Sequence, residues 1–542
     1  MTEGKSETTG RKIARALVAH GVDTVFGVPG AHTYDLMDGL YAERNALRFI
    51  STRHEQGAGY MAYGYAKCSG RPGIYTVVPG PGVLNSGAAL CTAYGANAPV
   101  MCITGNIMSH LIGRGRGQLH ELPDQLATLR GLTRGAEHID HPSATYATMA
   151  SLFARMTSGR RGPVAVEAPW DVFGQRALIE EPMIGTASPA PAPDPDAIKA
   201  AAALIAGARN PLIIVGGGAV DAADEVRALS HHLQAPVTSY RSGKGVLSAD
   251  DPNWLNFVAA SSFFRNVDLL IGIGSRLHMT WRSHPPRLKT IRIDIDPVEM
   301  VRLKPEVGIV ADASEGIRAL LKDLDRTPRA RNRGDEFREL NRKAEAAMGG
   351  LQPQMEYLKV LREVLPKDGF LVEEVSQMGF AARLGFPVYE PRRYVTCGYQ
   401  ENLGFGYNTA LGVKVAHRDK AVVSISGDGG FLFGAQELAT AVQHRIGVVS
   451  VVFNNSAYGN VLRDQKQSYD GRFIGSDLTN PDFCRLAESF GVTALRAGSP
   501  GDLRIALEKA LSLDAPALIE VPVEKGSEPS PWPFIRGDAS ID

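Results

Sequence analysis

Cysteine is scarce in this chain of 542 residues: only Cys68, Cys91, Cys102, Cys397 and Cys484 are present. Their odd number and wide spacing argue against a disulfide framework and against a structural zinc site. Sparse, scattered cysteines are typical of proteins in a reducing compartment, so we expect the cytoplasm.

Long apolar stretches and an excess of one charge are also lacking. No window approaches the ~20 apolar residues of a membrane span. Lys+Arg and Asp+Glu both total 58, and no basic run or zinc-finger spacing occurs. We therefore expect neither a membrane nor a nucleic-acid partner. The hydrophobic fraction of 44% and the charged fraction of 21% are those of a globular protein.

The length exceeds what one hydrophobic core can support, because cores stop growing near ~250–300 residues. Two stretches resemble linkers. The first, residues 180–196, is rich in Pro and Ala, and the second, residues 325–352, is polar, Arg-rich and expected to include a solvated helix. We predict three domains, at residues 1–183, 184–345 and 346–542.

Short, nearly continuous apolar runs alternate with helical periodicity in all three blocks. These runs lie at residues 24–28, 73–78, 98–104, 211–215, 268–274, 290–296, 421–426 and 448–453. Such runs are typical of parallel strands that are covered on both faces. We predict an α/β fold of three doubly wound parallel sheets, with ligands at the carboxyl ends of the strands.

One strand end combines glycines with an acid, in Gly427, Asp428, Gly429 and Gly430. Glycines let the backbone approach a phosphate, and a carboxylate can hold Mg²⁺, which prefers oxygen ligands. The next apolar strand ends before Asn454-Asn455, one helix and one strand later, so both sets of side chains should share an edge of the sheet. Either signal alone is more often a turn. Their combination favours a metal and phosphate site.

These residues, followed by Ala457, Tyr458 and Gly459, resemble the diphosphate-binding motif of thiamine-diphosphate enzymes. The likeness is to the group of acetolactate synthase, pyruvate oxidase and benzoylformate decarboxylase. It implies a pyrimidine-binding, a central and a diphosphate-binding domain, with Mg²⁺ held by Asp428, Asn455 and the carbonyl of Ala457. The cofactor contacts implied in this segment are Gly427, Asp428, Gly429, Gly430, Asn455, Ala457, Tyr458, Gly459, Asn460 and Val461.

The front of the chain carries the same resemblance. Residues 25–30, with Pro29 and Gly30, match the family's first strand and turn, and residues 53–66 match the segment of the cofactor-activating glutamate. The resemblance assigns that role to Glu55, whose carboxyl group would hydrogen-bond the aminopyrimidine N1′. The resulting imino tautomer can take the thiazolium C2 proton. Without the resemblance, an exposed glutamate at a helix start would be an equally good interpretation.

Residues 398–406 resemble the family's loop beneath the cofactor. Leu403 stands where a bulky apolar side chain forces the two cofactor rings into a V shape, and Glu401 is expected to contact the cofactor. A core leucine is the alternative for Leu403, but the flanking glycines fit a close backbone approach better.

Residues at variable positions of the family would decide the substrate. In the segment from Gln118 to Glu121, several relatives have Phe-Gln-Glu; Leu119 stands in place of the Phe and His120 in place of the Gln, and His120 could act as an acid or base with Gln118 nearby. His32, Leu119, Gln377 and Asp464 are expected to face the substrate, and Asp464 replaces the tryptophan of acetolactate synthases. A loop histidine for His120 and a helix-face glutamine for Gln377 remain alternatives.

The resemblance implies a magnesium-dependent lyase or carboligase acting on a 2-oxo acid, as a decarboxylase or an acetolactate-synthase-like enzyme. An FAD-linked oxidase and a 2-hydroxyacyl-CoA or oxalyl-CoA lyase are the alternatives. Residues 216–218 form a Gly-rich turn that could approach a nucleotide, but the dinucleotide fingerprint is incomplete, so FAD is possible and not favoured. The family's active sites use two subunits, which implies a homodimer or homotetramer with active sites at the interface.

Overall fold

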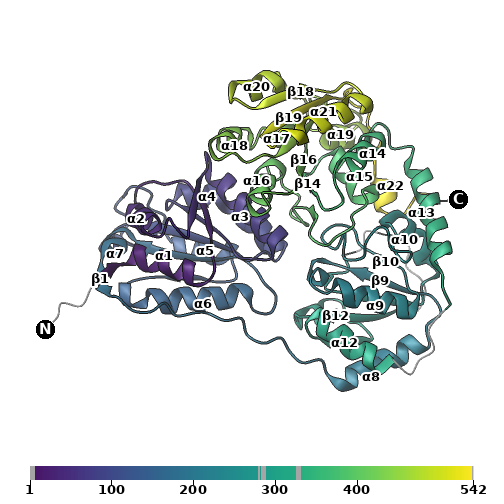
Figure 1. Cartoon of the computed structure of the whole chain (residues 1–542), viewed down its shortest axis with the longest axis horizontal. Helices are drawn as coiled ribbons and strands as arrows, with labels where there is room; N and C mark the ends of the chain where they lie inside the picture. The colour runs from purple at the N-terminus through teal and green to yellow at the C-terminus, as the bar shows by residue number, and fades with distance from the viewer. Residues whose placement is uncertain (1–5, 279–280, 282–287, 325–330, 540, 542) are drawn as a thin grey trace.

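The computed structural model describes residues 6–278, 281, 288–324, 331–539 and 541. Three parallel sheets flanked by helices make up this part of the chain, which confirms the predicted fold class (Figure 1). A short antiparallel pair joins β1 (Ser6–Thr8) to β8 (Arg176–Leu178). No helix in the described part combines the length and the apolar character needed to span a bilayer.

The first sheet has the strand order β3-β2-β4-β5-β7-β6. Its strands are β2 (Thr24–Gly27), β3 (Arg48–Ser51), β4 (Gly73–Val77), β5 (Val100–Asn106), β6 (Ala136–His138) and β7 (Val164–Pro169). Its helices are α1 (Thr9–Ala19), α2 (Tyr34–Ala42), α3 (Glu55–Ser69), α4 (Pro81–Gly95), α5 (Gln125–Leu132), α6 (Thr145–Thr157) and α7 (Trp170–Gly174).

The central sheet has the order β10-β9-β11-β12-β13. Its strands are β9 (Pro211–Val215), β10 (Val237–Thr238), β11 (Leu269–Ile273), β12 (Lys289–Asp294) and β13 (Val307–Val310). Its helices are α8 (Pro195–Ala206), α9 (Ala223–Leu233), α10 (Phe257–Phe263), α11 (Val298–Arg302) and α12 (Ala313–Leu324), followed by α13 (Gly334–Met348).

The third sheet has the order β15-β14-β16-β17-β19-β18. Its strands are β14 (Phe370–Glu373), β15 (Tyr394–Val395), β16 (Val422–Gly427), β17 (Val449–Asn454), β18 (Thr493–Arg496) and β19 (Ala517–Pro522). Its helices are α14 (Gln354–Val364), α15 (Gln377–Gly385), α16 (Gly406–Ala416), α17 (Asp428–Phe431), α18 (Leu438–His444), α19 (Gly459–Ser468), α20 (Phe483–Ser489), α21 (Pro500–Ser512) and α22 (Trp532–Ile535).

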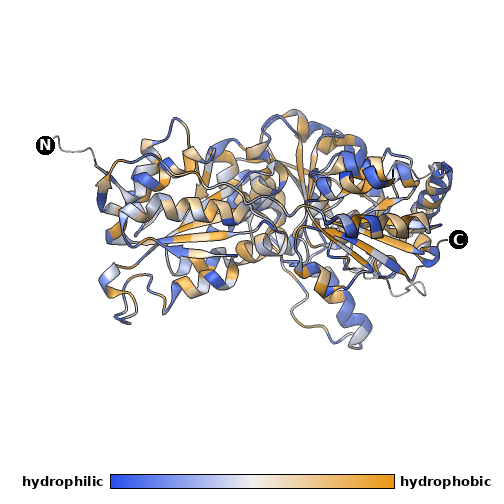
Figure 2. Cartoon of the chain, turned by 90° about the horizontal axis from the view of Figure 1, so that it is seen from below, coloured by the Kyte–Doolittle hydropathy of each residue, from blue (hydrophilic) through white to orange (hydrophobic). Residues whose placement is uncertain are grey.

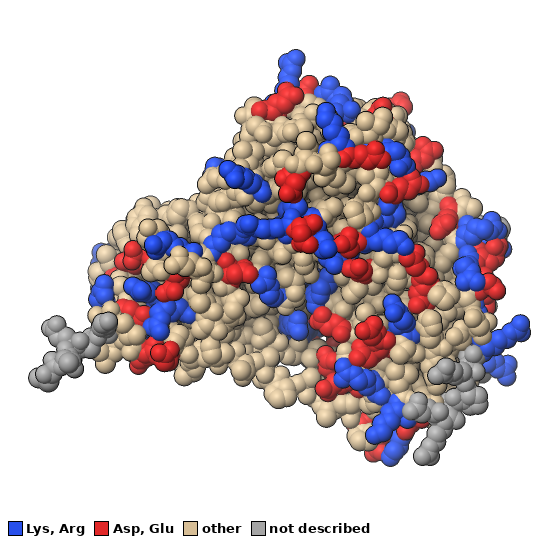
Figure 3. All heavy atoms as spheres, viewed as in Figure 1, with Lys and Arg blue, Asp and Glu red and all other residues tan. Residues whose placement is uncertain are grey.

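All eight apolar runs identified in the sequence form strands, with ends that differ by at most two residues. Figure 2 shows these strands as hydrophobic layers between helices, as expected for sheets covered on both faces. The outer surface is mixed: Figure 3 shows basic and acidic side chains interspersed across the molecule, in line with the balanced totals of charge.

The second predicted linker contains the expected helix, but that helix is not merely solvated. α13 buries Phe337, Ala344 and Met348 in a cluster with the central and third domains. Residues 325–330 of this linker lie outside the described residues. The first linker, by contrast, runs from β8 to α8 without a helix or strand.

The first and third domains pack directly on each other through α3 and α16. A Cβ atom on Gly64 would lie 2.2 Å from the Thr409 carbonyl oxygen, and one on Gly412 would lie 1.9 Å from that of Met61. Only glycine allows this approach, so the two helices touch backbone to backbone. The start of α3, where Glu55 lies, is thereby held at a fixed place against the third domain.

Candidate functional site

Some of the predicted site residues follow strands that flank the points where the strand order reverses: Pro29 and Gly30 follow β2, Gln377 follows β14 and Asp428 follows β16. In the first sheet this point separates β2 from β4, and in the third it separates β14 from β16. Crevices outside the carboxyl ends of strands at such points are the usual ligand sites of doubly wound folds.

Asp428 is the first residue of α17 and is 2% exposed. Its Oδ2 accepts a hydrogen bond of 2.6 Å from the Asn480 amide. Burial raises the pKa of the Asp428 carboxyl group, while that bond and the N–H groups of Gly429 and Ala457 act in the opposite direction. Burial disfavours the charged form of this carboxyl group, and a bound cation would stabilise that form.

The Asn454-Asn455 turn lies against the same acid. Asn480, which bonds Asp428, also donates to Asn454 Oδ1 at 2.9 Å, and Asn455 Oδ1 accepts from the Ala457 N–H at 3.1 Å. The three predicted metal ligands, Asp428, Asn455 and Ala457, therefore lie together at one edge of the third sheet.

Two further side chains at this edge were missed by the sequence analysis. Glu528, from the C-terminal tail, accepts a 2.6 Å hydrogen bond from Asn455 Nδ2. Burial raises the pKa of Glu528 to about 7, and the negative charge of Asp428 acts in the same direction. Asn480 is the other. No local pattern marks either residue, because each reaches the site from a loop that is distant in sequence.

Glycines and an aromatic ring shape the space beside Asp428. A Cβ on Gly429 would lie 2.5 Å from the Tyr458 ring, and one on Gly430 would lie 2.7 Å from the Glu374 carboxyl carbon. Gly427 is the last residue of β16 and directly precedes Asp428. Gly459 is equally constrained, since its Cβ would lie 2.9 Å from Asn455 Nδ2.

The predicted substrate residues of the third domain are placed unequally. Gln377 begins α15, is nearly buried, and accepts a 2.8 Å hydrogen bond from the Arg463 guanidinium. Asp464 is exposed, and Asn460 donates to it at 3.4 Å, while Val461 is 44% exposed. Arg463, which was missed, is therefore the charged residue of α19 that lies against Gln377.

The loop predicted to lie beneath the cofactor is fixed by buried charges. Glu401 contacts Arg241 of the central domain and lies 2.7 Å from Arg383, which also pairs with the fully buried Glu373. Leu403 is half-buried in this loop. The following N–H groups of Gly404 and Phe405 donate to the buried Glu374 carboxylate, whose pKa burial raises to about 7.

In the first domain, Glu55 begins α3 and accepts a 3.0 Å hydrogen bond from Asn85 of α4. The preceding backbone is anchored to the third domain, because the N–H groups of Arg53 and His54 donate to Glu437 at 2.9–3.1 Å. Glu55 thus has a fixed backbone and a partly exposed carboxyl group.

Two histidines meet at the carboxyl ends of β2 and β4. The rings of His32 and His120 are 5.3 Å apart, and His32 lies 4.7 Å from Trp170. Both residues have positive φ, 70° and 65°, and neither buried Nδ1 atom has a hydrogen-bond partner within the chain. Burial and the neighbouring His120 lower the pKa of His32. Strained, unpartnered imidazoles of this kind are typical of functional sites.

The remaining predicted residues of this domain surround the histidine pair. Pro29 and Gly30 follow β2. A Cβ atom on Gly30 would lie 2.6 Å from Val78 Cγ1, so this turn packs closely on the end of β4. The backbone N–H of Gln118 donates to Glu121, and the Leu119 side chain is 60% exposed. The loop carrying all three predicted residues, Gln118 to His120, therefore borders the β4 turn, where the His120 carbonyl lies against Gly80.

A cavity of about 790 Å³ lies at the junction of the three domains, lined by the carboxyl ends of β9, β11 and β12. Cationic side chains from the first and third domains line it, among them Lys67, Arg161 and Arg392. Burial lowers the pKa of Lys67 to about 8, and the two arginines act in the same direction.

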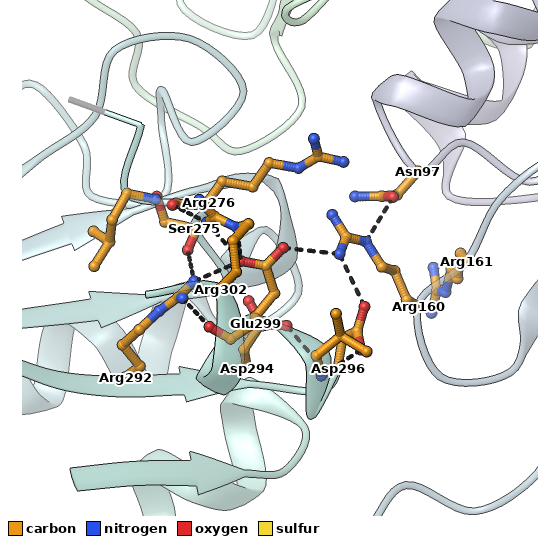
Figure 4. Close-up of polar contacts among 12 residues, drawn as sticks. Asn97, Arg160, Arg161, Ser275, Arg276, Arg292, Asp294, Asp296, Glu299 and Arg302 are labelled. Carbon is orange, nitrogen blue, oxygen red and sulfur yellow. Dashed lines mark hydrogen bonds and ion pairs between the residues drawn. The ribbon is translucent and has the colours of Figure 1, made fainter. Parts of the chain in front are cut away.

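One wall of this cavity is braced by ion pairs (Figure 4). Arg160 of the first domain reaches Asp296 and Glu299, both at 2.9 Å. Glu299 also pairs with the buried Arg292 at 3.0 Å and with Arg302 at 2.6 Å, and these arginines lower the Glu299 pKa to about 2 although burial opposes them. These ion pairs tie the first domain to the central domain at this wall.

The sequence matches three domain families: the N-terminal TPP binding domain of thiamine pyrophosphate enzymes at residues 7–128, their central domain at 198–320 and their C-terminal TPP binding domain at 374–521. The chain belongs to the thiamine pyrophosphate enzyme family.

Several curated relatives of this thiamine pyrophosphate enzyme are similar over nearly their whole length. A probable 2-ketoarginine decarboxylase of Pseudomonas aeruginosa is 33% identical over 96% of this chain and 95% of its own. A probable acetolactate synthase large subunit of Methanocaldococcus jannaschii is 33% identical, over 94% and 91%. The acetolactate synthase isozyme 1 large subunit of Escherichia coli is 28% identical, over 99% and 98%.

The residues at the edge of the third sheet fit the cofactor of a thiamine pyrophosphate enzyme. Carboxylate, amide and carbonyl oxygens are the ligands that Mg²⁺ prefers, and Asn480 Oδ1 is a further buried oxygen there without a partner in the chain. The glycine turn beside Asp428 carries no side chains, which suits a close approach of the backbone to a diphosphate. The family's defining chemistry and the local donor set therefore agree.

Proposed function

We propose that this thiamine-diphosphate enzyme uses Mg²⁺ and breaks or forms a carbon–carbon bond next to the carbonyl of a 2-oxo acid, as a decarboxylase or an acetolactate-synthase-like carboligase. The observation that carries the proposal is the convergence of Asp428, Asn455 and Ala457 at the glycine turn after β16. The names of the relatives support a 2-oxo acid as substrate.

Asp428, Asn455 Oδ1 and the Ala457 carbonyl would hold Mg²⁺. Backbone N–H groups of Gly427, Gly429 and Gly430 approach the phosphates. Tyr458, Gly459, Asn460, Val461, Glu401 and Leu403 would also contact the bound cofactor. Bound thiamine diphosphate supplies the electron sink for the reaction.

Glu55 would hydrogen-bond the pyrimidine ring of bound thiamine diphosphate and hold a proton at its carboxyl group. Its carboxyl group is held at the start of α3 by Asn85 and lies on the first domain with Pro29 and Gly30. Since the backbone before it is tied to Glu437, the acid keeps one position during turnover. Positioning of this kind is what a proton-transferring group requires.

His120 acts as the acid or base on the substrate, assisted by Gln118. His32 and Leu119 complete this side of the pocket, and Gln377 and Asp464 contribute from the third domain. The meeting of His32 and His120, whose rings are 5.3 Å apart, supports this role.

Two copies of the chain complete each active site, with Glu55 of one copy facing the diphosphate site of the other. Large exposed apolar side chains on both domains support a homodimer or homotetramer, among them Leu84, Leu119, Phe433, Phe473 and Ile474. We infer the domain division 1–183, 184–345 and 346–542, and a cytoplasmic location on the basis of five unpaired cysteines.

The central cavity supports a second ligand. Its volume of about 790 Å³, its Gly216–Gly218 turn and its cationic lining suit the diphosphate of a nucleotide such as FAD or a coenzyme A. The absorbance spectrum of the purified protein tests for FAD. A flavin band would favour the FAD-linked oxidase as the function. A colourless enzyme that is active would eliminate the FAD-linked oxidase.

A panel of 2-oxo acids and acyl-CoA substrates tests the proposed function. The substrates are incubated with enzyme, Mg²⁺ and thiamine diphosphate, and CO₂ release and ligated products are scored. We expect at least one 2-oxo acid to release CO₂ only when both cofactors are present. Turnover that is independent of thiamine diphosphate would overturn the proposal.

A further inference from the structure

The C-terminal tail returns to the metal motif after leaving the third sheet. Glu528 bonds Asn455, which lies 73 positions earlier in the chain. The tail is also held by Gln354, which donates to the Pro529 carbonyl at 3.3 Å. Further on, Trp532 of α22 donates its indole N–H to Asn460 Oδ1 at 3.3 Å. Two separate points of the cofactor motif are therefore tied to the tail.

The bond from Asn455 to Glu528 decides which way the Asn455 amide faces. Glu528 Oε2 accepts the bond from Asn455 Nδ2, so the NH₂ end of the amide faces the Glu528 carboxyl group. The oxygen end is then turned toward the Ala457 N–H, which in turn lies against Asp428. Without Glu528, of these two contacts only the Ala457 N–H would hold the amide, which could then rotate by half a turn and present its NH₂ group where a cation needs an oxygen.

The tail also has to stay in place for this bond to form. The Trp532 ring lies 5.4 Å from Phe380 on α15, in the cluster that joins the central and third domains. Asn460, its hydrogen-bond partner, belongs to the first turn of α19, directly after Gly459. Tail docking and the shape of the cofactor motif are thus parts of one contact surface.

We propose that Glu528 is a positioning residue, which orients Asn455 for Mg²⁺ and couples docking of the C-terminal tail to metal binding. The inference rests on the proposed function, because it assumes that Asn455 ligates the metal. Groups that orient a metal ligand through its second polar atom typically change metal affinity by about 10–100-fold when they are removed.

Isothermal titration of Mg²⁺ into full-length protein saturated with thiamine diphosphate tests the inference on Glu528→Ala, Glu528→Gln and Glu524→Ala. Glu524 is exposed in the same tail and serves as the matched control. We expect Glu528→Ala to weaken Mg²⁺ binding about 10–100-fold, and Glu528→Gln, which keeps an acceptor, to weaken it only a few-fold. Glu524→Ala should bind as the wild type does.

Tryptophan emission gives a second readout of the coupling. Addition of Mg²⁺ and thiamine diphosphate should shift the emission of the wild type through Trp532, and Glu528→Ala should lose this shift. Trp532→Phe shows how much of the signal comes from that residue. If Glu528→Ala does not fold, Glu528→Asp, one methylene shorter, carries the same expectation.

The outcomes separate the inference from the proposed function. Wild-type affinity in Glu528→Ala, or equal weakening in Glu524→Ala, overturns the positioning role while leaving the function intact. Failure of the wild type to bind thiamine diphosphate with Mg²⁺ overturns both.

Discussion

The first and third domains share one sheet topology but carry different residues at the ends of equivalent strands. Numbered along the chain within each domain, both sheets have the strand order 2-1-3-4-6-5. The residues that follow equivalent strands differ, however. β4 leads into Pro79-Gly80 without an acid, whereas β16 leads into Gly427-Asp428. The acid of the first domain, Glu55, lies instead at the start of a helix.

This difference shows how one architecture places two carboxylates in opposite environments. Asp428 is buried, bonded by an amide and backbone N–H groups, and ready for a cation. Glu55 is only partly covered and has one amide partner within the chain. Burial without a counter-charge suits the metal role proposed for Asp428, and an accessible carboxyl group suits the cofactor contact proposed for Glu55.

The largest expected effect comes from the first domain. Glu55→Gln keeps the hydrogen bond to Asn85 but cannot share a proton, so turnover should fall about a hundredfold to ten-thousandfold while magnesium-dependent cofactor binding survives. Steady-state kinetics and calorimetry measure the two quantities. Glu508→Gln, an exposed change on α21, is the control. Near-normal turnover would remove Glu55 from its assigned role.

The equivalent change in the third domain should impair cofactor binding, which the Glu55 variant is expected to preserve. Asp428→Asn removes a proposed metal ligand, so magnesium-dependent binding of thiamine diphosphate should weaken about a hundredfold or more. The ligand-free protein should be as stable as the wild type or more stable, because the raised pKa shows that burial disfavours the charged acid. Thermal melting and calorimetry, with Asp323→Asn as an exposed control, test this; unchanged binding would contradict the metal role.

Substitution of His120 in the histidine pair of the first domain should have a smaller effect on turnover than Glu55→Gln. His120→Gln keeps a hydrogen-bonding side chain but loses proton transfer, so kcat should fall about tenfold and its pH profile should flatten. His110→Gln, an exposed change in the loop before it, should leave both unchanged. A variant that differs only in KM would show that His120 binds the substrate without moving a proton.

The sequence predicted the sheets because their strands are short apolar runs buried on both faces, as in β9, whose ends match the predicted run. It also predicted the strand-end residues, whose chemistry is local: Asp428 after β16 and Asn455 after β17. Glu528 and Asn480 escaped prediction because they reach the site by long-range return of the chain. The central cavity escaped for the same reason, since three domains line it.

Helical phase explains another difference within the site. Asp464 drew attention because it replaces a tryptophan of the family, yet it lies on the exposed side of α19. Its neighbour Arg463 lies against Gln377. Neighbouring helix positions point about 100° apart, and α19 has no buried apolar stripe from which its inward face could be predicted.

The smallest expected effect lies where the two similar domains meet. His444 of α18 accepts a 3.2 Å hydrogen bond from the Ser51 N–H of β3. Burial lowers the pKa of His444, and Arg53 lowers it further. Between this lowered pKa and about 6.5 the unfolded chain binds more protons, so stability rises with pH there and is level above it. Protonation would also cancel the acceptor that Ser51 uses.

Urea midpoints at pH 7.5, 6.5 and 5.5 measure this contribution. We expect the wild type to lose stability below about pH 6.5 and His444→Gln to lose less, by under about 1 kcal/mol, because glutamine accepts the same bond without titrating. Only this difference is informative, since burial also lowers the pKa of His20 and His417. His110→Gln should follow the wild type. Parallel losses in the wild type and His444→Gln would mean that the contact between the domains does not depend on this proton.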